Sequence, residues 1–212
     1  MDPAPRHQCL IYDGPPSRQL SALAATVSEK LRQNFRCLYL NTKPMVAGMR
    51  SYAAAAGVDV THEMTKGSLL LSSDRGHLVG GRFDPQRMMQ LLNSALEQAL
   101  NDGYVGLWAT GDMTWQMGPD RDFARLLEYE WQLERFFRTH PQLSGVCQYH
   151  ADTLPRDRMR QGLMSHPGVF INETLSLVNP HFIPPESFTS GADQSAELNC
   201  VVGQLCGAGG LG

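Results

Sequence analysis

Short apolar runs alternate with helix-periodic segments along the chain. The first run, at 9–12, stops at a turn rich in Gly and Pro, and apolar residues then recur at three- and four-residue spacing from 17 to 34. This pattern predicts a strand, a turn and an amphipathic helix. Repeats of the pattern predict strands at 37–40, 68–72, 104–109, 145–149 and 168–171, a further pairing at 175–178, and helices at 45–56, 85–102, 120–138 and 155–165.

Most of the predicted strands are apolar at nearly every position. Strands of that kind are covered by helices on both faces, so we predict an α/β fold with a mostly parallel, doubly wound sheet. A chain of 212 residues suits one such domain, which we place at 1–185. The composition then shifts to Ser, Gly, Ala and Gln, which predicts a flexible tail or linker at 186–212 with a short helix near 196–205.

Composition and charge argue against several classes of function. No apolar run approaches the roughly 20 residues that span a bilayer, and the first residues lack the pattern of a signal peptide, so we expect a cytoplasmic protein without a membrane partner. The net charge of -3 and the scattered basic residues argue against direct binding of nucleic acid. The five Cys form no CxxC pair and are expected to be free thiols.

Ligands of open α/β sheets bind beyond the carboxyl ends of the strands, and this rule nominates specific loops. The nominated segments are 12–14, 41–42, 72–73, 110–115 and 149–150. The candidate residues there are Tyr12 and Asp13, then Asp112, Met113 and Trp115 in the 110–115 loop, and Tyr149 and His150 at the end of the fifth strand. The 110–115 loop combines a carboxylate, two hydroxyls, a thioether and an indole. In the alternative interpretation, Met113 and Trp115 are core residues packed against the edge of the sheet.

A second group of candidate side chains lies on the strands themselves. His7 and Cys9 share one face of the first strand, and Cys147 and Tyr149 share one face of the fifth. His7 and Cys9 could form half of a metal site or a reactive thiolate. A buried Cys beside a hydrogen-bonded His is the commoner arrangement, so we predict no metal.

Catalytic signals are sparse. A phosphate-binding loop would follow the first strand, yet Pro15 and Pro16 remove two N–H donors there and Asp13 adds negative charge. Glu130 and Glu134 lie four apart on one helix face, where such a pair either serves acid–base chemistry or is solvated. The sequence has no nucleophile elbow and no zinc-protease motif. We therefore predict a protein that is not an enzyme, and the sequence identifies no cofactor.

Several short motifs follow one another along residues 6–183. They are His7-x-Cys9 with Tyr12, GGRFDP at 80–85, GY at 103–104, GDMTW at 111–115, LEYE at 127–130, CQY at 147–149 and HP at 166–167. Together they resemble the MEDS domain, the methanogen and methylotroph sensory domain of a dichloromethane-responsive regulator and of bacterial sensor kinases. The resemblance implies a RecA-like or related α/β fold and the sensing of simple hydrocarbon derivatives. This chain departs from the family pattern at Asp112, where Glu is commoner, and at His150, where an acidic residue often follows Gln-Tyr, so the resemblance does not name the ligand.

The leading hypothesis is a ligand-binding sensory module of signal transduction. Its predicted site comprises His7, Cys9, Tyr12, Asp13, Asp112, Met113, Trp115, Glu130, Cys147, Tyr149 and His150. One alternative is a divergent RecA-like ATPase in which Asp112 or Glu130 positions water, and another is a protein-interaction scaffold. The expected partners are a small-molecule ligand and a separate kinase or transcription regulator, with a homo-oligomer as a further option.

Overall fold

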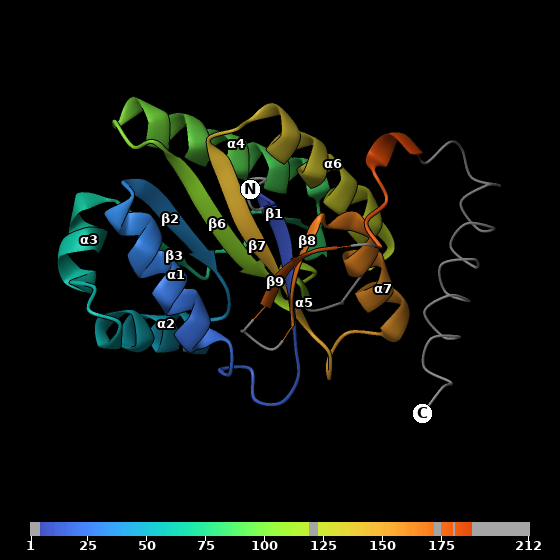
Figure 1. Ribbon diagram of the computed structural model, residues 1–212, viewed down its shortest axis with the longest axis horizontal. Helices are drawn as coiled ribbons and strands as arrows, with labels where there is room; N and C mark the ends of the chain where they lie inside the picture. The colour runs from blue at the N-terminus through green and yellow to red at the C-terminus, as the bar shows by residue number, and fades with distance from the viewer. Residues whose placement is uncertain (1–4, 119–122, 172–174, 180, 188–212) are drawn as a thin grey trace.

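The computed structural model describes residues 5–118, 123–171, 175–179 and 181–187, and its centre is a seven-stranded sheet (Figure 1). The strand order is β3-β2-β6-β7-β1-β8-β9, and β9 alone runs antiparallel to its neighbour within this sheet. The strands are β1 (His7–Tyr12), β2 (Phe35–Leu40), β3 (Leu69–Ser72), β6 (Gly106–Asp112), β7 (Leu143–His150), β8 (Gly168–Ile171) and β9 (Leu175–Val178). A six-strand parallel sheet confirms the predicted doubly wound α/β class.

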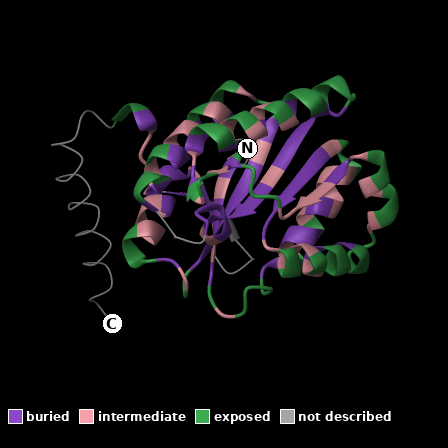
Figure 2. Cartoon of the chain, turned by 180° about the vertical axis from the view of Figure 1, so that it is seen from behind, coloured by how far each residue is buried: buried purple, intermediate pink, exposed green. Residues whose placement is uncertain are grey.

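Helices cover both faces of this sheet. On one face lie α1 (Leu20–Arg32), α2 (Lys43–Ala55) and α3 (Val60–Lys66), and on the other lie α4 (Pro85–Asn101), α6 (Leu126–Thr139) and α7 (Arg156–Ser165). The short helices are α5 (Met113–Gln116), η1 (Phe123–Arg125) and η2 (Pro185–Ser187). Figure 2 shows the strands mostly buried between helices whose outer surfaces are exposed.

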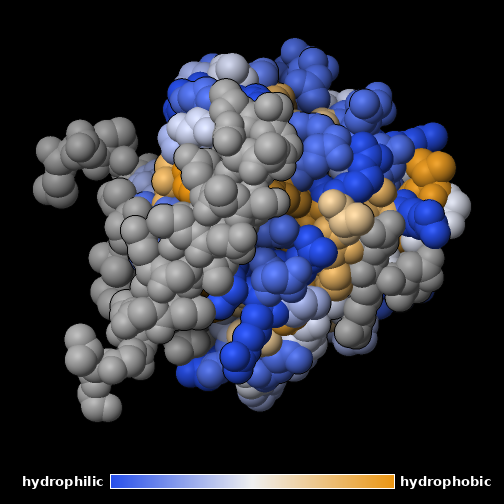
Figure 3. All heavy atoms as spheres, turned by 90° about the vertical axis from the view of Figure 1, so that its right-hand side faces the viewer, coloured by the Kyte–Doolittle hydropathy of each residue, from blue (hydrophilic) through white to orange (hydrophobic). Residues whose placement is uncertain are grey.

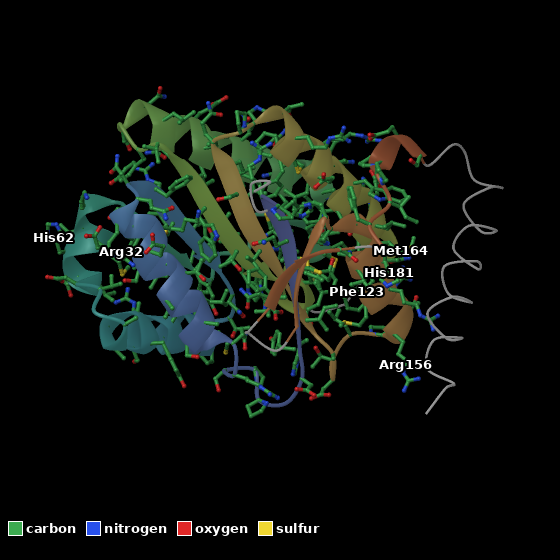
Figure 4. All side chains as sticks on the ribbon, in the orientation of Figure 1. Arg32, His62, Phe123, Arg156, Met164 and His181 are labelled. Carbon is green, nitrogen blue, oxygen red and sulfur yellow. The ribbon has the colours of Figure 1, made fainter. Side chains whose placement is uncertain are left out.

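The two helix layers give the domain two apolar cores. Alternation along β1 sends Leu10 and Tyr12 into the core beneath α1 and α2, and Cys9 into the core beneath α4, α6 and α7. Figure 4 shows the two ends of the molecule, with the labelled Arg32 and His62 at α1 and α3 and Met164 at α7. On the face seen in Figure 3, hydrophilic residues frame a smaller apolar area among the described residues.

Local sequence signals explain where α4 begins. Asp84 accepts hydrogen bonds from the backbone N–H groups of Gln86, at 2.9 Å, and Arg87, at 3.1 Å, and Pro85 occupies the first helical position, as predicted. The preceding hairpin of β4 (Leu78–Val79) and β5 (Arg82–Phe83) turns through two glycines with φ of 58° and 82°. Two consecutive positive φ values are the requirement of a type I′ turn, which glycine meets without strain.

The structure corrects the prediction at 110–115, where we expected a loop. The strand β6 continues to Asp112, because its pairing with β7 extends to the register pair Asp112 and Gln148. α5 then begins at Met113, with the Asp112 carboxylate accepting from Trp115 N at 2.8 Å.

Other differences are smaller. α3 was not predicted, and the predicted 120–138 helix starts as η1 at Phe123 before it becomes α6. The start of that predicted helix and the predicted 196–205 helix lie outside the described residues, as does most of the predicted 186–212 tail.

Candidate functional site

A cleft opens beyond the carboxyl ends of β1, β2, β6 and β7. The chain leaves β1 and β2 toward the α1–α2 face and leaves β6 and β7 toward the opposite face, so these connections diverge and leave a crevice between them. Its volume is about 370 Å³, and its lining residues are Tyr12, Pro16, Asn41, Thr42, Met45, Arg75, Asp112, Thr114, Trp115, Gly118, His150 and Thr153.

The Asp112 carboxylate is the buried charged group of this cleft. It is 8% exposed and accepts hydrogen bonds from Trp115 N at 2.8 Å and from Tyr12 Oη at 3.3 Å. Burial raises the pKa of Asp112 above its ordinary value, although both hydrogen bonds favour the ionised form. A carboxylate held in that way is suited to bind a hydrogen-bond donor or an electropositive group of a small ligand.

Tyr12 and His150 form one wall of the cleft. Their rings stack with centroids 4.8 Å apart, and His150 Nε2 donates to the Gly14 carbonyl oxygen at 2.7 Å. Gly14 N in turn donates to the Asp152 carboxylate at 2.8 Å. These contacts fix the loop after β1 against the end of β7, so the wall is largely preformed.

The side chains of the 110–115 segment lie in two places, the apolar core and the cleft. Met113 is fully buried in the apolar core, whereas Trp115 packs against His77 at a ring distance of 5.0 Å and also lines the cleft. Asp13, also predicted for the site, is exposed and pairs with Arg18 at 2.6 Å without lining the cleft.

The remaining predicted residues form a separate group in the core beneath α6 and α7. His7, Cys9, Glu130, Cys147 and Tyr149 are all buried there and do not line the cleft. The eleven predicted residues therefore do not make a single site, because residues that alternate along β1 and β7 face opposite layers of helices.

The thiols of this second group are poorly suited to nucleophilic chemistry. Cys9 and Cys147 are register partners on neighbouring strands, and both are free and buried. Burial raises the pKa of each thiol, with the charge of Glu130 acting in the same direction. A reactive cysteine needs the opposite shift.

Sequence reasoning left several residues of both groups out of the predicted site. Asn41 and Thr42 line the cleft from the end of β2, in a loop that the strand-end rule nominated but from which no residue was taken into the predicted site. His166 joins the buried group from the end of α7, and burial lowers the pKa of its imidazole to about 3. Only its place in a short His-Pro motif could have marked it.

Asp112→Asn is expected to change how stability depends on pH. Because burial raises the pKa of Asp112 above 3.8, the folded protein keeps a proton where the unfolded chain has lost it. The contribution of this group to the free energy of unfolding therefore falls as pH rises from 3.8 through the folded pKa. Asparagine keeps an acceptor for Trp115 N and has no charge to bury, so the variant should gain stability over wild type as pH rises.

Urea unfolding of both proteins between about pH 4 and pH 7 measures this difference. Asp84→Asn, which also replaces a helix-capping carboxylate, is the control for the chemical change itself. A constant difference between wild type and Asp112→Asn across that range would contradict a raised pKa.

Comparisons with known proteins agree with the sensory-domain resemblance. The family model described as the methanogen/methylotroph, DcmR sensory domain (MEDS) matches residues 6–167. This match spans most of the chain, and the protein belongs to the MEDS family. The family is a class of sensory domains, so the chain carries a sensory module. Among the described residues, no helix has the length and apolar character needed to cross a membrane.

The searches of curated proteins and of solved structures give no further information about function. A search of curated proteins gives no match. Among solved structures, Catharanthus roseus tryptophan decarboxylase in complex with L-tryptophan aligns with 86% of this chain and 39% of its own, at 11% identity and a TM-score of 0.41. The chain thus spans well under half of that protein, and so weak a likeness carries no argument about function.

Proposed function

We propose that this domain binds a small molecule in the strand-end cleft and acts as a sensory module rather than as an enzyme. The observation that carries the proposal is the cleft itself, preformed where the connections of the sheet diverge and holding the buried Asp112 carboxylate. Burying a carboxylate lowers stability unless partners compensate, so its presence in a solvent-facing cleft favours a role in binding.

The lining favours a ligand with an apolar body and one polar or electropositive group. Tyr12, Met45 and Trp115 offer apolar surface, while Asn41 and Asp112 offer polar atoms. Simple hydrocarbon derivatives, such as small halogenated or methylated compounds and short alcohols, have this character. The resemblance to the MEDS domain implies the same class of ligand.

The contacts around the loop after β1 count against the alternative of ATP hydrolysis. Pro15 and Pro16 have no N–H group, Gly14 N donates to Asp152, and Arg18 pairs with Asp13. A triphosphate therefore meets few donors where a phosphate-binding loop would present several. A RecA-like relationship remains part of the proposal, since β1 is an inner strand of the sheet and lies between β7 and β8.

We extend the proposal to the output of the module. A sensory family implies transfer of a signal, and we propose a separate cytoplasmic kinase or transcription regulator as the recipient. The cleft would report occupancy through the Tyr12–His150 contact, because a ligand against this wall acts on the ends of β1 and β7 together.

Isothermal titration calorimetry tests the binding site. The probes are one- and two-carbon halogenated and methylated compounds, short alcohols and acids, and Mg-ATP. We expect at least one small organic probe to bind, and Asp112→Asn to weaken its affinity by about tenfold or more, which is roughly 1.4 kcal/mol. Tryptophan fluorescence provides a second readout, since the Trp115 indole lines the cleft.

The matched control for this titration is Asp84→Asn. Asp84 caps α4 outside the cleft, and Asn is also a good capping residue, so this variant should bind like the wild type. Binding that Asp112→Asn leaves unchanged would place the ligand elsewhere. ATP hydrolysis that Asp112→Asn abolishes would favour the ATPase instead.

A further inference from the structure

Four electron-donating side chains converge in the core beneath α6 and α7. They are His7 from β1, Glu130 from α6, Cys147 from β7 and His166 from the end of α7, and we call them the donor cluster. All four are buried, and their donor atoms lie within 4.8 Å of one another. In Figure 1, β1 and β7 lie side by side near the centre of the view, and α6 and α7 lie to their right.

Four of the six separations between donor atoms match the edges of a metal-centred tetrahedron, and all six are within 4.8 Å. His7 Nε2 lies 3.6 Å from Glu130 Oε2, and Cys147 Sγ lies 3.7 Å from each of these two atoms. His166 Nε2 lies 3.4 Å from Glu130 Oε2. Metal–ligand bonds of about 2.0 to 2.3 Å give tetrahedral edges of about 3.3 to 3.8 Å.

The hydrogen bonds around His166 direct a lone pair into the cluster. His166 Nδ1 donates to the Gly162 carbonyl oxygen at 2.6 Å, so in the neutral ring Nε2 carries the lone pair. That Nε2 atom is fully buried and has no hydrogen-bond partner. A buried polar atom without a partner is costly, and a metal ion would satisfy it.

Second contacts orient the other donors as metal sites require. His7 Nδ1 lies 2.9 Å from Glu134 Oε2, which leaves Nε2 facing the cluster. Tyr149 Oη donates to Glu130 Oε1 at 2.5 Å and leaves Oε2 directed at the other donors. Carboxylate–histidine pairs and hydrogen-bonded carboxylates of this kind are typical outer contacts of metal ligands.

We propose that the donor cluster binds one zinc-class divalent ion in a closed, tetrahedral site. Two imidazole nitrogens, a thiolate and a carboxylate oxygen are a donor set that such an ion prefers. The ion displaces the Cys147 thiol proton and, from a protonated His7, the Nε2 proton, and both protons leave to solvent. The charges of the ion, the thiolate and the Glu130 carboxylate then sum to zero, which suits a buried site.

The site has a structural role in this proposal. All four positions are filled by protein, so no position remains for water or substrate, and the ion joins β1, β7, α6 and α7. A depression of about 350 Å³, lined in part by His7, Glu134 and Arg138, provides a route for the ion from solvent. None of the donor residues lines the strand-end cleft, so the site and the proposed sensory function are tested separately.

Metal analysis of the full chain tests the proposal. The protein is stripped with a chelator, reconstituted with Zn²⁺ or Co²⁺ at neutral pH, desalted and measured by inductively coupled plasma mass spectrometry. We expect about one ion per chain. The Co²⁺ form should show the intense visible absorption of tetrahedral coordination and a thiolate-to-metal charge-transfer band.

Variants locate the ion. Cys147→Ser and His166→Gln should each lower the bound metal at least tenfold and remove the tetrahedral Co²⁺ spectrum. Cys37→Ser, which changes an equally buried thiol on the opposite face of the sheet, should retain both. Circular dichroism of each variant shows whether it folds.

Two results would overturn the proposal. One is wild-type protein that folds but takes up no stoichiometric ion, which would leave His7 as an ion-pair partner of Glu130 and Glu134 without metal. The other is a tetrahedral Co²⁺ spectrum without thiolate charge transfer. Both results are measured on the wild-type protein, so the test remains valid even if a variant fails to fold.

Discussion

Glu130→Ala is expected to lower the free energy of unfolding by about 3–5 kcal/mol, the cost of removing one member of a buried ionic group. Glu130 is fully buried, and its carboxylate accepts from Tyr149 Oη and lies 3.6 Å from His7 Nε2. Without it, the Tyr149 hydroxyl loses its acceptor and His7 loses a counter-charge. Urea unfolding followed by circular dichroism measures the change.

Glu128→Ala is the matched control, because it makes the same substitution two residues earlier on the same helix. Glu128 is exposed, and among the described residues it pairs with Arg125 at 3.2 Å and Gln132 at 3.1 Å, so its removal should cost less than about 1 kcal/mol. Both variants are measured with chelator present, which separates the hydrogen bonds from any bound ion. If both variants lost the same free energy of unfolding, the buried contacts of Glu130 would contribute no more to stability than the exposed contacts of Glu128.

The architecture could be predicted from the sequence because each element carries a strong local signal. The apolar run before Asp13 and the helical spacing after Pro16 define β1 and α1, and Asp84 with Pro85 marks the start of α4 within one residue. The end of β6 was less predictable. The residues after Ala109 look polar enough for a loop, but pairing with the buried β7 keeps them in the sheet.

The candidate sites were only partly predictable. The strand-end rule found Tyr12, Asp112, Trp115 and His150, because parallel topology alone brings carboxyl ends together. The donor cluster depends instead on how α6 and α7 dock against the sheet. Sequence spacing does not specify that docking, so the sequence grouped His7 and Glu130 with the cleft residues and could not place His166 beside them.

The two sites share strand β7 at different points along its length. Cys147 belongs to the donor cluster, and His150, three residues later, forms the wall of the cleft. Parallel pairing with β1 links these positions in turn to Cys9 and Tyr12. An ion held in the cluster would therefore fix the strands whose ends shape the cleft, and metal removal should weaken ligand binding without changing the cleft residues themselves.

Gly145→Ala is expected to lower the free energy of unfolding by about 3 kcal/mol, at the upper end of the usual cost of overpacking. A β-carbon at Gly145 would overlap the Ala109 carbonyl oxygen on the neighbouring strand and approach Phe137 Cζ to 3.2 Å. Backbone atoms in the middle of a sheet cannot move aside as a surface side chain can. The missing side chain also leaves room for Phe137 to stack on His7, with ring centroids 4.5 Å apart.

The comparison that isolates this steric effect is Gly76→Ala. A β-carbon at Gly76 would meet only Asp74 Oδ2, at 3.8 Å, and its φ is not positive, so the free energy of unfolding should change by less than about 0.5 kcal/mol. Because Gly145 is the register partner of His7, Gly145→Ala should also displace the His7 imidazole. If Gly145→Ala were as stable as Gly76→Ala, β6 and β7 would be able to separate locally. The donor cluster would then be less rigid than its hydrogen bonds indicate.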